Sequence, residues 1–201
     1  MGLRELKMQR TRLLIADKAL ELFAAQGFEA TTIEQVAAAA EVGTRTLYRY
    51  FPTKESLIAG FVEEHLTGSL EVMRDQSPDT PLPEALQAVL GRLMSVVAED
   101  SDRVLAVYAL ARRTDSVQAR LADQTWRWRN ELAEELAKRV GGPSATMVAA
   151  LCAETTMGLF EVVLRRWVDS GGEADLWAIA NEALDLLHTG AVPLPARRRG
   201  C

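Results

Sequence analysis

Residues 31–54 have the sequence TTIEQVAAAAEVGTRTLYRYFPTK, which predicts two short helices joined by a tight turn. Thr31 is a favourable N-cap and Glu34 follows three positions later, so we expect a capping box between these side chains and the backbone N–H groups. Apolar residues then recur with helical spacing at Ile33, Val36, Ala37 and Ala40. The first helix is therefore expected from about residue 32 to about residue 40.

The second helix is expected from Thr44 to Tyr50. Gly43 precedes it and can adopt the backbone angles of a tight turn. Pro52 ends the helix, and Thr53 is a suitable cap for a third helix. This succession of helices is typical of a helix-turn-helix DNA-binding unit.

The side chains of the second helix divide into two faces, because successive residues are rotated by about 100°. The expected core side carries Leu47, Tyr50 and Phe51. The opposite side carries Arg45, Tyr48 and Arg49, with Thr44 and Thr46 at its edges. Guanidinium groups can bond guanine edges and hydroxyl groups can bond phosphates, so this side suits a DNA major groove. For this helix taken alone, a solvated basic surface is the alternative interpretation.

A longer run, from Ala19 to Ile58, carries several motifs in order. They are Ala19-x-x-Leu22-Phe23, Gly27-Phe28, Thr31-Thr32-Ile33, Ile33-x-x-Val36-Ala37, Val42 and Thr46-Leu47-Tyr48-Arg49-Tyr50-Phe51-Pro52-x-Lys54-Glu55-x-Leu57. This run resembles the N-terminal domain of the TetR family of bacterial repressors. The family pattern most often has Gly and Ser where this chain has Glu41 and Gly43. The recognition helix is therefore expected to lack its usual side-chain cap.

The resemblance implies an all-α homodimer of about nine helices, with an N-terminal three-helix DNA-binding domain and a C-terminal helical core for ligand binding and dimerisation. Matched by position, the usual phosphate contacts correspond to Thr32, Thr46, Tyr48 and Lys54. The usual base contacts correspond to Thr44, Arg45 and Arg49. The expected organisation is a DNA-binding domain over residues 1–54, a ligand-binding and dimerisation domain over 55–190, and a disordered tail over 191–201.

The net charge of −5 is divided unevenly along the chain. Residues 1–54 contain eight basic and six acidic residues, a net of +2, which leaves −7 for the remainder. An acidic core repels DNA while the basic end attracts it, so the asymmetry is expected to orient the protein on its partner.

Composition favours a cytoplasmic protein. The chain has 201 residues, of which 48% are hydrophobic, and its two cysteines, Cys152 and Cys201, do not form a disulfide framework. Charged residues crowd the first twelve positions, as they do not in a secretory signal peptide. No apolar run of about 18 residues is expected to span a bilayer, so no membrane partner is predicted.

The remaining periodicity is helical, with breakers at 77–83 and 141–143. Helices are expected over residues 54–74, 86–98, 103–112, 116–140, 144–168 and 175–187. Within 116–140, Trp126 points almost opposite to Trp128, which indicates a helix covered on both sides or one that lines a cavity. Following the family resemblance, the candidate pocket residues are Met94, Tyr108, Trp126, Met157 and Phe160. Packing in an ordinary core is the alternative for each of them.

The last two helices carry too much apolar surface for one core-facing stripe, which predicts a dimer interface in the form of a four-helix bundle. The alternative is that the helix over 144–168 is the buried centre of a monomer. Gly158 and the alanines would permit close approach between helices.

No enzyme site is predicted. His65 and His188 are isolated, no phosphate-binding glycine loop is present, and Cys152 lies in an apolar run where a thiol is inert. No catalytic residue, metal or cofactor is therefore expected. The predicted function is a ligand-responsive repressor on a palindromic operator, released by a small apolar or amphipathic effector. The faint resemblance of residues 128–187 to an acyl-CoA-binding subgroup suggests an acyl-CoA-like effector, and the alternative function is a helical ligand-binding or scaffold dimer without specific DNA binding.

Overall fold

The computed structural model describes residues 2–196; residue 1 and residues 197–201, which are the last part of the predicted disordered tail, lie outside the described part. Within the described part the chain forms nine helices and no strand, which confirms the all-α prediction. Their bounds are α1 Leu3–Gln26, α2 Ile33–Ala39, α3 Thr44–Tyr50, α4 Ser56–Asp75, α5 Leu82–Glu99, α6 Ser101–Ala111, α7 Asp115–Ala137, α8 Ala145–Asp169 and α9 Leu176–His188.

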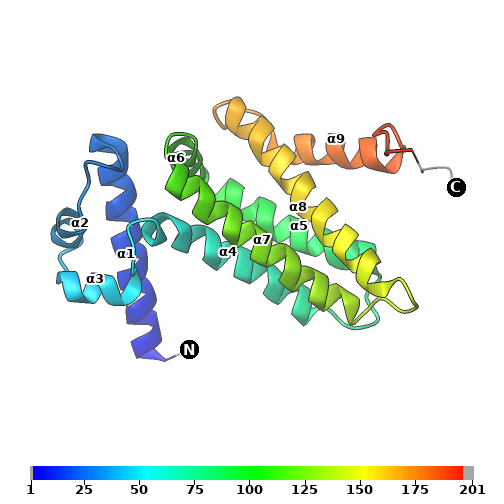
Figure 1. The fold of residues 1–201 in the computed structure, drawn as a ribbon, viewed down its shortest axis with the longest axis horizontal. Helices are drawn as coiled ribbons and strands as arrows, with labels where there is room; N and C mark the ends of the chain where they lie inside the picture. Colours follow the sequence, from blue (N-terminus) through cyan, green and yellow to red (C-terminus); the bar gives the residue numbers. More distant parts are fainter. Residues whose placement is uncertain (1, 197–201) are drawn as a thin grey trace, which may run out of the picture.

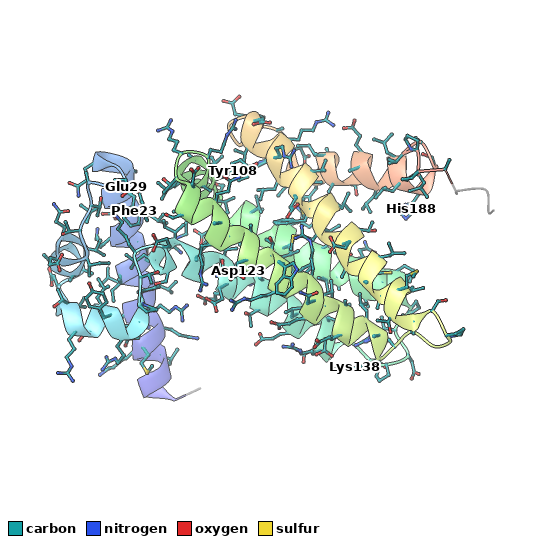
Figure 2. All side chains as sticks on the ribbon, viewed as in Figure 1. Phe23, Glu29, Tyr108, Asp123, Lys138 and His188 are labelled. Atoms are coloured by element: carbon teal, nitrogen blue, oxygen red, sulfur yellow. The ribbon has the colours of Figure 1, made fainter. Side chains whose placement is uncertain are left out.

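The first three helices form a small unit at one end of the molecule (Figure 1). Gly27 ends α1 in the left-handed region, with φ of +90°, as expected for a residue that follows a helix. Phe23 of α1, labelled in Figure 2, packs against Phe28, and the two ring centroids are 5.0 Å apart. Leu47 of α3 and Phe51 belong to the same core, so α3 is fixed by its apolar side.

Helix α4 leaves this unit and runs into the larger group formed by α5 to α9 (Figure 1). Its start is held by a reciprocal pair of bonds: the Ser56 N–H donates to Thr53 Oγ1 and the Thr53 N–H donates to Ser56 Oγ, both at 3.2 Å. Thr53 therefore closes the turn that leads into α4, whereas the N-cap of the helix itself is Glu55, two residues later than predicted. Farther along, Trp128 of α7 is buried and donates from Nε1 to Leu66 O at 3.1 Å and to Ser69 Oγ at 2.9 Å, which locks α7 onto α4.

Helix α8 departs from two expectations. By length and composition it is apolar enough to cross a membrane, with a mean hydropathy of 1.6, so the prediction that no segment reaches this limit is wrong. In the structure α8 packs against α5, α7 and α9. Only 33% of its apolar window is buried, so α8 is also not the buried centre of a monomer.

Candidate DNA-binding surface and ligand cavity

The cap of α2 lies one residue later than predicted. The Gln35 N–H donates to Thr32 Oγ1 at 3.2 Å, and the Thr32 N–H donates to Gln35 Oε1 at 2.8 Å. Thr32 and Gln35 therefore form the capping box, and the predicted pairing of Thr31 with Glu34 is wrong. The physical reason is burial: Thr31 is 1% exposed, and its hydroxyl donates to Gly27 O at 2.7 Å.

The turn between α2 and α3 places its strain at Glu41. This residue has φ of +53°, in the left-handed region that side chains with a Cβ rarely adopt. Gly43, the residue to which the sequence assigned the unusual conformation, has φ of −71° and ψ of 145°, which any residue can adopt. Gly43 provides no side-chain hydrogen bond, so α3 begins uncapped, as predicted.

Replacing Glu41 with glycine is expected to raise the free energy of unfolding by about 0.5–1 kcal/mol. Left-handed geometry costs a residue with a Cβ roughly 1–2 kcal/mol, and the greater entropy of glycine in the unfolded chain cancels part of the gain. The control is Glu34→Gly, because Glu34 is exposed on α2 in ordinary helical geometry. Glycine at this position should lower the free energy of unfolding by about 1 kcal/mol. Urea unfolding measures both, and a loss at Glu41 equal to that at Glu34 would rule out strain in the turn.

Helix α3 presents the two faces predicted for it. Leu47 is 0% exposed and the following Phe51 is 1% exposed, whereas Tyr48 is 49% exposed. Arg45 and Arg49 are also exposed, on the same side as Tyr48. Two guanidinium groups and a phenol therefore project from one short helix into solvent, a donor set suited to base edges and phosphates.

Lys54 lies beneath this surface rather than fully on it. Its Nζ donates to Phe28 O at 2.7 Å and reaches Thr31 O at 3.4 Å. The ammonium also lies 4.3 Å from the centroid of the Phe28 ring, and the side chain is 22% exposed. Lys54 thus joins the start of α4 to the loop between α1 and α2, an arrangement that the sequence pattern did not indicate because the bonded residues are 23 and 26 positions away.

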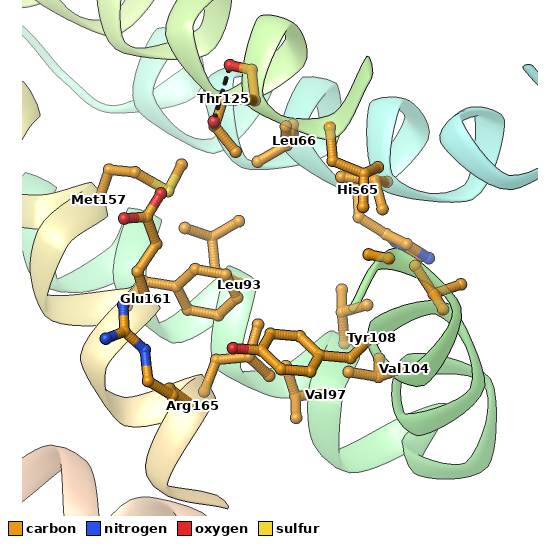
Figure 3. Close-up of a pocket in the computed structure, with 18 of the residues that line it drawn as sticks. His65, Leu66, Leu93, Val97, Val104, Tyr108, Thr125, Met157, Glu161 and Arg165 are labelled. Carbon is orange, nitrogen blue, oxygen red and sulfur yellow. Dashed lines mark hydrogen bonds between the residues drawn. The ribbon is translucent and has the colours of Figure 1, made fainter. Parts of the chain in front are cut away.

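A cavity of about 530 Å³ lies in the larger helical group, between α4, α5, α6, α7 and α8. Its lining is mainly apolar, and side chains from α6 and α8 face each other across it (Figure 3). Tyr108, Met157 and Phe160 line this cavity, in agreement with the sequence pattern. This volume and lining suit a small apolar or amphipathic molecule.

The other two predicted pocket residues do not line the cavity. Trp126 is 61% exposed on the outer side of α7, and Met94 is fully buried in the core. Helical periodicity placed Trp126 correctly opposite Trp128, but it could not show that the second face of α7 is left uncovered. The charged lining residues Arg112, Arg129, Glu161 and Arg165 were missed, since charges at helical spacing ordinarily predict a solvated face.

Most of these charges are paired. Arg129 Nη2 lies 2.7 Å from Glu161 Oε1, and Arg129 Nε lies 3.2 Å from Glu154 Oε2. Arg112 Nη1 lies 3.1 Å from Asp169 Oδ1. Burial lowers the pKa of His65, another lining residue, which favours its neutral form.

An N-terminal helix-turn-helix with an exposed donor face, joined by one helix to a core that contains an apolar cavity, defines a DNA-binding regulator of transcription. The model of bacterial regulatory proteins of the tetR family matches residues 15–60, and that of the MftR C-terminal domain matches residues 80–192. The chain belongs to the TetR family of bacterial regulatory proteins.

Similar proteins agree with this assignment. The transcriptional regulator TcmR of Streptomyces glaucescens is 37% identical over 146 residues, which cover 70% of this chain and 65% of that relative. The putative mycofactocin biosynthesis regulator MftR of Mycobacterium tuberculosis is 27% identical over 154 residues, covering 77% and 78% of the two chains. The structure of Thermus thermophilus FadR in complex with lauroyl-CoA is similar with a TM-score of 0.59 and 25% identity, covering 94% of this chain and 100% of that chain.

Proposed function

We propose that the protein is a cytoplasmic, homodimeric repressor that leaves a palindromic operator when a small apolar or amphipathic molecule enters the core cavity. The main observation behind this proposal is that α3 has two different faces. Its apolar face is buried, while Arg45, Tyr48 and Arg49 project into solvent. In a dimer, two such helices enter successive major grooves about 34–36 Å apart and thereby block transcription nearby. The mechanism includes no catalytic step, metal or cofactor.

The contacts are assigned by chemistry and position. Thr44, Arg45 and Arg49 are proposed to contact bases, and Thr32, Thr46, Tyr48 and Lys54 to contact phosphates. Two observations support a phosphate contact by Thr32. The residue is exposed, and it caps the N-terminus of α2, where the helix dipole favours an anion. Lys54 can contribute its remaining donor capacity, since two backbone carbonyls already use part of it.

Self-association is proposed through α8 and α9. Apolar side chains remain exposed along one stripe of α8 and on α9: Met147, Leu151, Val162, Trp177, Leu186 and Leu187. Gly158 lies within the α8 stripe, and a Cβ built there meets no atom within 4 Å. A second copy of the same two helices would bury this surface as a four-helix bundle.

Two structural links can carry the effector's influence to the DNA-binding unit. Helix α4 contributes Phe61 to the cavity and is the next helix after the recognition helix α3. On α6, Arg103 forms an ion pair with Asp17 of α1 and lies 4.9 Å from the centroid of the Phe61 ring. An effector that displaces α4 and α6 would change the distance between the recognition helices α3 of the two subunits. Effector and operator must then weaken each other by the same factor.

An acyl-CoA-like molecule is the proposed class of effector. The cavity has a volume of about 530 Å³ and a mainly apolar lining, which suits a hydrocarbon chain, and the similar Thermus thermophilus FadR was solved in complex with lauroyl-CoA. Other apolar ligands of similar size also fit the lining.

Selection of bound sites from random double-stranded DNA tests the proposed function. We expect an enriched palindrome with half-sites about one helical turn apart. Adding the effector should then reduce binding to that sequence. If no sequence is enriched, the alternative function, a helical ligand-binding or scaffold dimer without specific DNA binding, is favoured.

Arg49→Ala is expected to relax base preference at one position of each half-site and to cost about 1–3 kcal/mol of binding free energy. Arg49 is exposed on the donor face of α3, so its removal should leave the fold intact. Competition binding with single-base variants of the selected operator measures the effect. A uniform loss for all sequences would assign Arg49 to phosphate instead.

A further inference from the structure

Two guanidinium groups converge at the rim of the cavity. Arg112 directly follows α6, Arg165 lies near the C-terminal end of α8, and both line the cavity. The ion pair of Arg112 with Asp169 holds the first guanidinium against α8. Because Asp169 and Arg165 are one helical turn apart, their side chains lie on the same face of α8. Arg112 is therefore held within about one turn of Arg165.

At this rim Arg112 and Arg165 carry two positive charges against one negative charge on Asp169, because Glu161, one turn before Arg165 in the lining, is paired with Arg129. Asp169 pairs with Arg112, while Arg165 makes no ion pair or side-chain hydrogen bond with any residue in the described part of the chain. The next residue, Arg166, points elsewhere and pairs with Glu182 at 2.8 Å. Asp169 thus offsets the charge of Arg112 only, and Arg165 retains all its donors for a ligand.

The rest of the cavity does not offer a competing site for a charged group. Arg129 forms ion pairs with Glu161 and Glu154, which offset its charge, although its buried Nε–H has no hydrogen-bond partner among the described residues. Phe61, Leu66, Leu93, Val97 and Phe160 supply an apolar interior. The charge available to a ligand is therefore restricted to the rim.

Tyr108 adds a polar group on the side opposite Arg165. Its ring projects from α6 into the cavity, and its hydroxyl points toward the α8 wall that carries Glu161 and Arg165 (Figure 3). A phenol in this position can donate a hydrogen bond to an anion held by the guanidinium groups.

We propose that the effector is an anionic amphiphile whose carboxylate or phosphate head is bound by Arg165 and Arg112, with Tyr108 donating to it, while its hydrocarbon tail occupies the apolar interior. This inference rests on the proposed function only in taking the cavity as the effector site. It specifies the sign of the effector's charge and the side chains that bind it.

The test uses the purified full-length protein without DNA and four probes with the same twelve-carbon tail, below their micelle concentrations. The probes are dodecanoate, dodecyl phosphate, dodecanol and dodecyltrimethylammonium. Isothermal titration calorimetry measures each affinity for the wild type, Arg165→Gln, Arg112→Gln and the control Arg120→Gln. Arg120 is a matched control because it lies on α7, pairs with Asp123 and does not line the cavity.

The wild type should bind the two anions at least about tenfold more tightly than dodecanol, with the ammonium probe weakest. Arg165→Gln should lower the affinity for both anions by about tenfold and leave the affinity for dodecanol unchanged. Arg120→Gln should change none of the four affinities. The tighter of the two anions distinguishes a free acid from a phosphate-bearing ligand, and either one supports the proposal.

Three results would overturn the inference. Equal affinity for all four heads would remove the anion site while leaving the cavity as an effector site. An anion preference that survives intact in both Arg165→Gln and Arg112→Gln would place the head group elsewhere. Absence of binding by all four probes would reject both this inference and the cavity itself as a site for amphiphiles, whereas operator selection would still test DNA binding separately.

Discussion

Gly158→Glu is expected to convert the proposed dimer into a folded monomer and to weaken operator binding by about 100-fold or more. Gly158 lies in the exposed apolar stripe of α8, where a new side chain meets no atom of its own protomer. In the proposed four-helix bundle the glutamate would be desolvated against the second copy, at a cost of several kcal/mol per carboxylate. A monomer then binds only one half-site and loses the gain from joining two recognition helices in one body.

Sedimentation at low micromolar protein measures the first part of this result, against a chain mass of 22.1 kDa. Gly158→Ala is the control, because the small alanine side chain still permits close approach of the helices across the proposed interface. It should also stabilise the helix by about 1 kcal/mol. Circular dichroism and titration with an amphiphile should show that Gly158→Glu retains the fold and the cavity. An unchanged dimer in Gly158→Glu would show that this stripe is not the interface.

Lys54→Met is expected to lower the free energy of unfolding by about 2–3 kcal/mol. The substitution removes the charge-assisted hydrogen bonds that Lys54 Nζ donates to the carbonyls of Phe28 and Thr31. Methionine keeps the apolar stem of the side chain and its packing against Phe28. Urea unfolding measures the change. Lys18→Met is the control, since the exposed pair of Lys18 with Glu21 should contribute less than about 1 kcal/mol.

A second measurement separates the two roles of Lys54. If its ammonium also meets a phosphate, the slope of operator affinity against salt concentration should flatten by about one unit in Lys54→Met. Stability that stays within about 0.5 kcal/mol of the wild type would contradict the structural role. An unchanged salt slope with reduced stability would restrict Lys54 to holding the loop between α1 and α2.

The helices and the faces of α3 were predictable because their causes are local. Gly27 and the segment before Leu82 separate helices through local backbone preferences, and rotation along a helix determines that Leu47 and Tyr48 face opposite ways. The cap of α2 was misplaced by one residue because Thr31 and Thr32 are equally good caps in sequence. Only the packing of Thr31 into the core makes Thr32 the cap.

The cavity depended on contacts between distant segments. Periodicity identified Trp126 and Met94 as large side chains on helical faces, yet one lies in solvent and the other in the core. Conversely, Arg165 was not predicted to line the cavity, and it does so together with Arg112, which pairs with Asp169 one turn farther along α8. Whether a side chain packs, lines a cavity or faces solvent depends on which helix covers it, and helix order in sequence does not specify that.

The sequence by itself determined the class of the fold, the family and the donor face of α3, since capping, breaking and helical rotation act over a few residues. Tertiary structure alone decided that Lys54 bonds the loop before α2, that Glu41 takes the left-handed position in the turn, and that Arg112 and Arg165 both line the cavity. The physical reason is that burial and ion pairing are properties of groups brought together in space, and a bond such as that from Lys54 to Phe28 joins residues 26 positions apart.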